Sequence, residues 1–214
     1  MRKPSPNDVA ELAASLGRDL DERQAMLLAE YLGTLAKWNR SMNLVGADRW
    51  RDALSNLVAD SWHLADFLVE LSLPDSPRTL DLGAGAGLPG IPLRVFWEAG
   101  EYTLVEIRKK RVAFMRFVLA HMRLERTVVA GCRVEELPQG SFPVDLVLSR
   151  AFMPWDDLLA LVGPWLTPEG SCVVMANEKP PREFPGWTIT GVAGYPAPGG
   201  RRYFWSLSPA SISK

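Results

Sequence analysis

A glycine-rich segment, Thr79 to Gly90, contains the residues whose spacing most clearly serves chemistry. A short apolar run ends in the acid Asp81, and three glycines follow at alternate positions, Gly83, Gly85 and Gly87. Glycine lacks a Cβ, so the backbone there can approach a ligand closely. The helix expected after the turn supplies unpaired N–H groups at its first residues. The segment therefore predicts a ligand-binding turn between a strand and a helix.

Spacing alone leaves two cofactors open. The run Gly85–Gly90 satisfies the GxGxxG pattern of dinucleotide-binding turns, whereas Asp81 with the three alternate glycines is the pattern of S-adenosylmethionine (SAM) sites. Asp81 would repel a pyrophosphate but not a sulfonium cation. Pro89 and Pro92 flank the helix start, where the dinucleotide pattern needs a close-packing glycine. These features favour SAM, and NAD remains the alternative.

Glu106 is the second candidate acid. It ends the next apolar run, about twenty residues beyond the glycines, where a carboxylate can accept hydrogen bonds from both hydroxyls of a ribose. Parallel strands bring their carboxyl ends to one edge of the sheet, so Glu106 is expected beside the glycine turn.

The elements that must position these residues change character along the chain. Residues 1–73 read as helices, with Ser5 and Asp21 as N-caps, and the prolines in 73–77 mark a boundary. Residues 78–214 alternate short apolar runs with helical ones, which predicts a parallel sheet with helices on both faces. Strands are expected at 79–82, 102–105, 127–130, 144–148 and 172–175, with helices at 108–122 and 155–166. Two final runs, 187–192 and 203–207, are expected to pair antiparallel at the sheet edge, joined by residues 195–200.

Composition narrows the class of protein. The 214 residues carry a net charge of −1 and are 47% hydrophobic, which suits a globular chain with a substantial core. No apolar run reaches the roughly 18 residues of a membrane span, the first residues are not a signal core, and two isolated cysteines predict neither a disulfide scaffold nor a metal site. We therefore expect a cytoplasmic protein.

The basic residues are concentrated in one stretch of the sequence. Between Glu106 and Arg133 there are eight basic residues and two acidic ones, so this stretch is either a binding surface for a polyanion or a solvent-exposed helix face.

Six short motifs carry a resemblance to a known family. They occur in the order Trp38-Asn39-x-x-x-Asn43-Leu44, Asp60-Ser61, Asp81–Leu93 (DLGAGAGLPGIPL), Lys110-Arg111-Val112-x-Phe114, Arg133–Glu136 and Asp145–Ala151 (DLVLSRA). Together they resemble the RsmG (GidB) family of bacterial small-subunit rRNA guanine-N7 methyltransferases. The Leu-Pro-Gly-Ile-Pro-Leu continuation is much more specific than a bare glycine pattern, and the resemblance extends from about Trp38 to the tail.

The resemblance implies a fold, a cofactor and a substrate. The fold would be the α/β class I SAM-dependent methyltransferase fold, a Rossmann-like, mostly parallel seven-stranded sheet with an antiparallel C-terminal strand and an N-terminal helical extension. The substrate would be a guanine in the decoding-region loop of 16S rRNA, and the partner would be 16S rRNA or the small ribosomal subunit. Separately, the sequence shows no heptad seam or exposed apolar repeat, so a monomer is expected. The residues implied at the cofactor are Asp81, Gly83, Gly85, Gly87, Leu88, Glu106, Val134, Glu135 and Arg150, with no metal.

Arg150 is also the candidate catalytic residue, on the guanine edge or on a phosphate, and Trp38 and Phe152 are candidates to stack on the base. Guanine N7 has no proton to remove, so no general base is expected, and alignment would supply most of the rate. The sequence departs from the family at Asn56 and Leu57, ahead of the Asp-Ser pair, and at Ala176 and Asn177. Methyl transfer to another substrate, or a SAM-binding RNA-interaction module, remain the alternatives.

Overall fold

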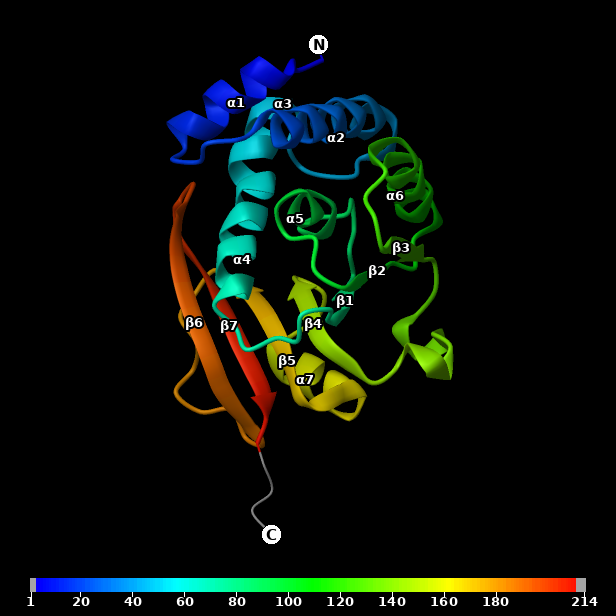
Figure 1. The fold of residues 1–214 in the computed structure, drawn as a ribbon, viewed down its shortest axis with the longest axis vertical. Helices are drawn as coiled ribbons and strands as arrows, with labels where there is room; N and C mark the ends of the chain where they lie inside the picture. The colour runs from blue at the N-terminus through cyan, green and yellow to red at the C-terminus, as the bar shows by residue number, and fades with distance from the viewer. Residues whose placement is uncertain (1–2, 211–214) are drawn as a thin grey trace.

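The structure, a computed structural model, describes residues 3–210, so the ends of the two predicted regions, 1–2 and 211–214, lie outside it. The described part of the chain is built around a seven-stranded sheet, and a group of helices covers one end of this sheet (Figure 1). The strands are β1 (Arg78–Leu82), β2 (Glu101–Val105), β3 (Thr127–Ala130), β4 (Val144–Arg150), β5 (Leu166–Ala176), β6 (Trp187–Ala197) and β7 (Gly200–Pro209).

The strand order is β3-β2-β1-β4-β5-β7-β6. The first five strands are parallel, whereas β7 runs antiparallel to both β5 and β6. The chain reverses direction along the sheet between β1 and β4, and ligands of open α/β sheets bind at such a switch point, beyond the carboxyl ends of the strands. The predicted parallel sheet and antiparallel edge pair are confirmed.

The two faces of the sheet bury alternate residues of each strand. Leu104 and Leu148 belong to the core under α4 (Ala59–Val69), α5 (Gly90–Phe96) and α6 (Lys109–Met122). Their neighbours Val105 and Val147 belong to the core under α7 (Trp155–Val162). Helices therefore cover both faces, as predicted.

The N-terminal helices share the first of these cores. Both predicted caps are confirmed as capping boxes, Ser5 with Asp8 ahead of α1 (Pro6–Ser15) and Asp21 with Gln24 ahead of α2 (Glu22–Met42). Residues 50–69 of the predicted helical region do not form one α-helix, because α3 (Trp50–Ala53) and α4 are joined by a π-helical turn, Leu54–Val58. A single inserted turn leaves the apolar spacing nearly unchanged, so periodicity did not reveal it.

Four boundaries of helices and strands differ from the predicted ones. Strand β5 begins at Leu166 instead of Cys172. Its irregular first residues include Pro168 and Gly170, which are not typical of a strand, so the sequence did not predict this start. The helix predicted to Leu166 ends at Val162, before a short 3₁₀ turn that contains Pro164. Strands β6 and β7 continue through the predicted 195–200 loop to a turn at 198–199. Pro196 is tolerated there because β6 is the edge strand.

Candidate functional site

A cavity of about 320 Å³ lies at the carboxyl ends of β1 and β2. We call it the Glu106 cavity. Its walls come from the end of β1, the loop that follows β2, the loop after β3 and the loop after β4. It is lined by Leu82, Gly83, Val105, Glu106, Ile107, Arg108, Arg111, Cys132, Arg133, Val134, Glu135, Ala151, Phe152 and Met153.

Glu106 is the buried acid of this cavity, with 5% of its surface exposed. Its carboxylate accepts the backbone N–H of Gly85 at 3.1 Å and that of Arg108 at 2.9 Å, and the guanidinium of Arg111 donates to it at 3.4 Å. These donors fix the orientation of the carboxylate. Oε2 accepts two of them, whereas Oε1 accepts only the Arg108 N–H and can still accept from a ligand hydroxyl. The predicted place of Glu106 beside the glycine turn is confirmed.

The glycine turn needs its glycines for conformation and for space. Gly83 has φ of +68°, and a Cβ there would lie 2.6 Å from Cδ2 of Phe152. Two side chains from the N-terminal helices hold the turn from behind: the Tyr31 hydroxyl donates to the Ala86 carbonyl at 2.9 Å, and the Ser61 hydroxyl donates to the Pro89 carbonyl at 3.0 Å. The turn is thus clamped by residues distant in sequence.

Asp81 lies beneath the turn and does not line the cavity. It is 1% exposed and accepts hydrogen bonds from the Tyr102 hydroxyl, at 3.1 Å, and from the backbone N–H of Gly90. Burial raises the pKa of Asp81 to about 7, although both donors lower it. Through these two hydrogen bonds, Asp81 connects the start of α5 to β2. Gly85, Gly87 and Leu88 also belong to the turn without lining the cavity.

A second cavity, of about 690 Å³, adjoins the first and shares Ala151 and Met153 with it. We call it the Arg150 cavity. It lies between the ends of β4 and β5, helix α4 and the β6–β7 pair, and Arg150 lines it instead of the Glu106 cavity. The full lining is Asp60, Ser149, Arg150, Ala151, Met153, Trp155, Val174, Met175, Ala176, Asn177, Glu178, Tyr195, Arg202 and Trp205.

Asp60 organises the charges of this cavity. It is 2% exposed, and its carboxylate accepts from Arg202 at 2.7 Å and from the Tyr195 hydroxyl at 2.9 Å. It also forms an ion pair with Arg150 at 3.3 Å. Tyr195 and Arg202 face each other in the β6–β7 register. One carboxylate opposes two guanidinium groups, so this corner of the cavity keeps a net positive charge.

The π-helical turn supplies backbone acceptors to the same arginines. The Asn56 carbonyl accepts from Arg202 at 2.7 Å, and the Leu57 carbonyl accepts from Arg150 at 3.5 Å. The departures from the family at these two positions therefore leave the arginine contacts in place. Ala176 and Asn177, the other two departures, line the Arg150 cavity directly.

The structure brings some predicted residues together and separates others. Gly83, Glu106, Val134 and Glu135 line one cavity, with Phe152 beside them, whereas Trp38 packs between Phe114 and Phe117 away from it. Sequence reasoning did not predict the contacts of Tyr31, Tyr195 and Arg202. The one signal was the polar pair Asp60-Ser61 within an otherwise apolar helical stretch.

The described residues hold no cluster of three or more His, Cys, Asp or Glu side chains arranged for a metal ion. Within residues 3–210, no helix has the length and apolar character to cross a membrane.

Comparison with known proteins gives a family match. A family model described as "rRNA small subunit methyltransferase G" (GidB) matches residues 24–186. Curated proteins named ribosomal RNA small subunit methyltransferase G are similar over most of the chain. The one from Nitratidesulfovibrio vulgaris is 50% identical over 186 residues, 86% of this chain and 85% of that protein. The one from Lawsonia intracellularis is 42% identical over 206 residues, 95% of each.

Solved structures support the fold. A putative class I S-adenosylmethionine-dependent methyltransferase from Listeria monocytogenes superposes with a TM-score of 0.60 at 13% identity, over 88% of this chain and 70% of that one. The predicted α/β methyltransferase fold is confirmed.

Proposed function

Because the chain belongs to the rRNA small subunit methyltransferase G family, we propose that it transfers a methyl group from SAM to N7 of a guanine in 16S rRNA. The observation that carries the proposal is the junction of two cavities at Ala151 and Met153. One cavity holds a buried carboxylate that suits a nucleoside cofactor. The other is larger, is lined by aromatic side chains and has two arginines around Asp60 at one corner. Because the proposed substrate is 16S rRNA, we propose that the reaction takes place in the cytoplasm.

The Glu106 cavity fits SAM by the chemistry of its groups. Glu106 offers a buried carboxylate to ribose hydroxyls, Gly83 lets the backbone come close, and Val134 and Glu135 offer a backbone and a carboxylate to the adenine. Bound there, SAM supplies a methyl group activated by a sulfonium cation. Asp81 keeps the turn in shape from below, so its part in binding is indirect.

The protein's own part in the reaction is to align the guanine. N7 has an in-plane lone pair and no proton, so the site needs no general base, and proximity supplies most of the barrier reduction. A guanidinium fork on O6 and N7 would occupy that lone pair. Arg150 is therefore assigned to O6 alone or to a phosphate of the target nucleotide. The indole of Trp155 and the thioethers of Met153 and Met175 offer surfaces for the base.

The test is methyl transfer from labelled SAM to small subunits or naked 16S rRNA from a strain that lacks the modification. Borohydride–aniline cleavage then maps N7-methylguanine, and one cleaved guanine is expected. If label is incorporated into the RNA but no guanine is cleaved, the methyl group is transferred to an atom other than guanine N7. Cofactor binding without any incorporation would favour a SAM-binding RNA-interaction module.

A further inference from the structure

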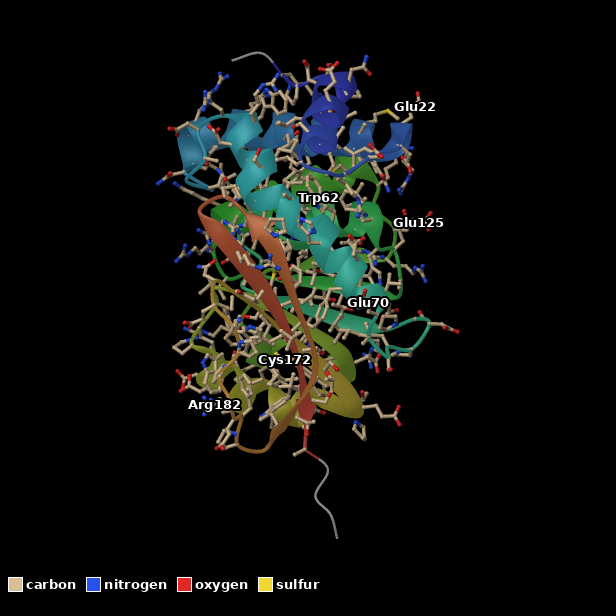
Figure 2. All side chains as sticks on the ribbon, turned by 90° about the vertical axis from the view of Figure 1, so that its left-hand side faces the viewer. Glu22, Trp62, Glu70, Glu125, Cys172 and Arg182 are labelled. Carbon is tan, nitrogen blue, oxygen red and sulfur yellow. The ribbon has the colours of Figure 1, made fainter. Side chains whose placement is uncertain are left out.

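Four arginines from three separate elements converge on a small hollow that shares no lining residue with either cavity. Arg23 comes from the start of α2, Arg94 from α5, and Arg123 and Arg126 from the loop between α6 and β3. Together with Glu98, Leu124 and Glu125 they line about 180 Å³, which we call the Arg123 hollow. Figure 2 labels Glu125 there, on the same side of the molecule as Glu22 at the start of α2.

The positive charge of the hollow is only partly compensated. Arg23 pairs with Glu98 at 2.5 Å, but within residues 3–210 no carboxylate forms an ion pair with Arg94, Arg123 or Arg126. Arg94 is 2% exposed and donates to the carbonyls of residues 97–100 and 125 and to a threonine hydroxyl, all of them neutral. Burial has the largest effect on the pKa of Arg94 and lowers it. Tyr102 and Glu98 raise this pKa, whereas repulsion from the nearby charge of Arg126 lowers it. An anion at the hollow would relieve this repulsion.

The backbone of the loop is left-handed where it presents two of these arginines. Arg123 has φ of +51° and Arg126 has φ of +50°, in the left-handed region that glycine or asparagine adopts more readily. Arg123 is the left-handed C-cap of α6, with its N–H donating to the Leu119 carbonyl, so its conformation ends the helix. The left-handed conformation of Arg126 costs about 1 kcal/mol or more, and such strain is concentrated at functional positions. Arg123 and Arg126 are also the two exposed members of the arginine group on this loop.

We propose that the Arg123 hollow binds a phosphate of the RNA backbone, as a second anchor for the substrate. Guanidinium groups suit phosphate because their planar N–H fork can donate two parallel hydrogen bonds. Helix α6 connects the two places: Arg108 and Arg111 line the Glu106 cavity at its start, and Arg123 follows its end. Its 14 residues span about 21 Å. Exposed Lys109, Lys110 and Arg116 lie between, so the basic residues continue from the methyl-transfer site to the hollow. The proposal rests on the proposed function only in taking RNA as the partner.

The experiment compares RNA binding of Arg123→Gln and Arg126→Gln with the natural chain across a range of salt concentrations. Glutamine keeps most of the side-chain length and meets the same backbone strain, so the fold is preserved. Each variant is expected to bind 16S rRNA about three- to tenfold more weakly, with the salt slope reduced by about one. Affinity for SAM is expected to be unchanged. Arg182→Gln is the matched control, because Arg182 is exposed at the opposite end of the molecule (Figure 2) and should change neither quantity.

A second arm separates RNA phosphate from a free anion. Inorganic phosphate and pyrophosphate are titrated against the natural chain and Arg123→Gln while the melting temperature is recorded. If these anions stabilise only the natural chain and the RNA salt slope is unaltered, the assignment to RNA is overturned in favour of a free oxyanion. If neither readout responds to the arginines, the hollow is not a phosphate site. If the natural chain binds no RNA at all, the proposed function fails, and the phosphate titration still tests the hollow.

Discussion

The Glu106 cavity and the Arg150 cavity adjoin each other but are built in different ways. The first takes its walls from the ends of consecutive strands, so its residues come from the glycine turn and the loops directly after β2 and β3. The second is assembled from α4, β4, β5 and the β6–β7 pair, with its arginines held by Asp60, some 90 and 142 residues away in sequence. Local sequence motifs thus define the half of the site that we assign to the cofactor. Tertiary packing defines the half that we assign to RNA.

Two adjacent residues of α4 connect the halves. The Ser61 hydroxyl holds the Pro89 carbonyl of the glycine turn, and the Asp60 carboxylate holds the arginines of the second cavity. Successive residues of a helix point in directions about 100° apart, so one short segment can reach both. This gives a physical reason for an Asp-Ser pair at that position.

The comparison predicts its largest effect for Gly83→Val. A branched side chain at φ +68° would be strained, and its Cβ would meet the Phe152 ring at 2.6 Å, so the turn must move. A displacement costing about 3 kcal/mol corresponds to a loss of SAM affinity of about a hundredfold. Isothermal titration calorimetry with SAM measures it.

Gly17→Val is the matched control for this variant. Gly17 has φ of +84°, and a Cβ added there would meet no atom within 4 Å beyond its chain neighbours, so the control carries the strain without the collision. SAM affinity is expected to be unchanged in the control. Unaltered affinity in Gly83→Val would remove the glycine turn from the cofactor site.

A smaller and more selective effect is expected for Asp60→Asn. Loss of the carboxylate charge leaves two partly buried guanidinium groups without their shared partner, and breaking such buried pairs commonly costs about 3–5 kcal/mol. Arg150 should lose its fixed position, so kcat/KM for RNA should fall about ten- to a hundredfold, mainly through KM, while SAM affinity stays within about twofold. Steady-state methyl transfer and calorimetry measure the two quantities.

Asn56→Ala is the control from the same segment. Its backbone carbonyl, which accepts from Arg202, is retained, so RNA methylation should change by less than about twofold. Equal losses of RNA and SAM binding in Asp60→Asn would show that the halves do not act separately.

The same contrast explains how far the sequence could lead. The parallel strands, the antiparallel pair and the place of Glu106 followed from apolar periodicity and from the rule that parallel strands end at one edge. The contacts of Arg202 and Tyr195 with Asp60 could not be predicted, because they depend on how the β6–β7 pair folds against α4. The π-helical turn could not be predicted either, and two of its carbonyls accept hydrogen bonds from Arg150 and Arg202.

The smallest effect is expected for substitution of Asp81, and it tests whether this residue belongs to the Glu106 cavity. Its carboxyl has a pKa of about 7 in the fold because it is buried, against an ordinary value near 3.8. A raised pKa means that the folded chain holds this proton more tightly than the unfolded chain does. The stability that Asp81 contributes is therefore complete below about pH 4 and is lost as the pH rises to about 7, by up to about 1.4 kcal/mol per pH unit.

Asp81→Asn cannot titrate but can still accept from Tyr102. The urea midpoint of the natural chain should fall between pH 4 and pH 7, and the part of this fall that is due to Asp81 should be absent from Asp81→Asn. The difference between the two urea midpoints at each pH measures that part. Because Asp81 lies beneath the turn, SAM affinity of Asp81→Asn at pH 6 should change by less than about threefold. If affinity collapses while the pH profile of stability is unchanged, Asp81 acts on the cofactor directly and the first cavity extends below the glycine turn.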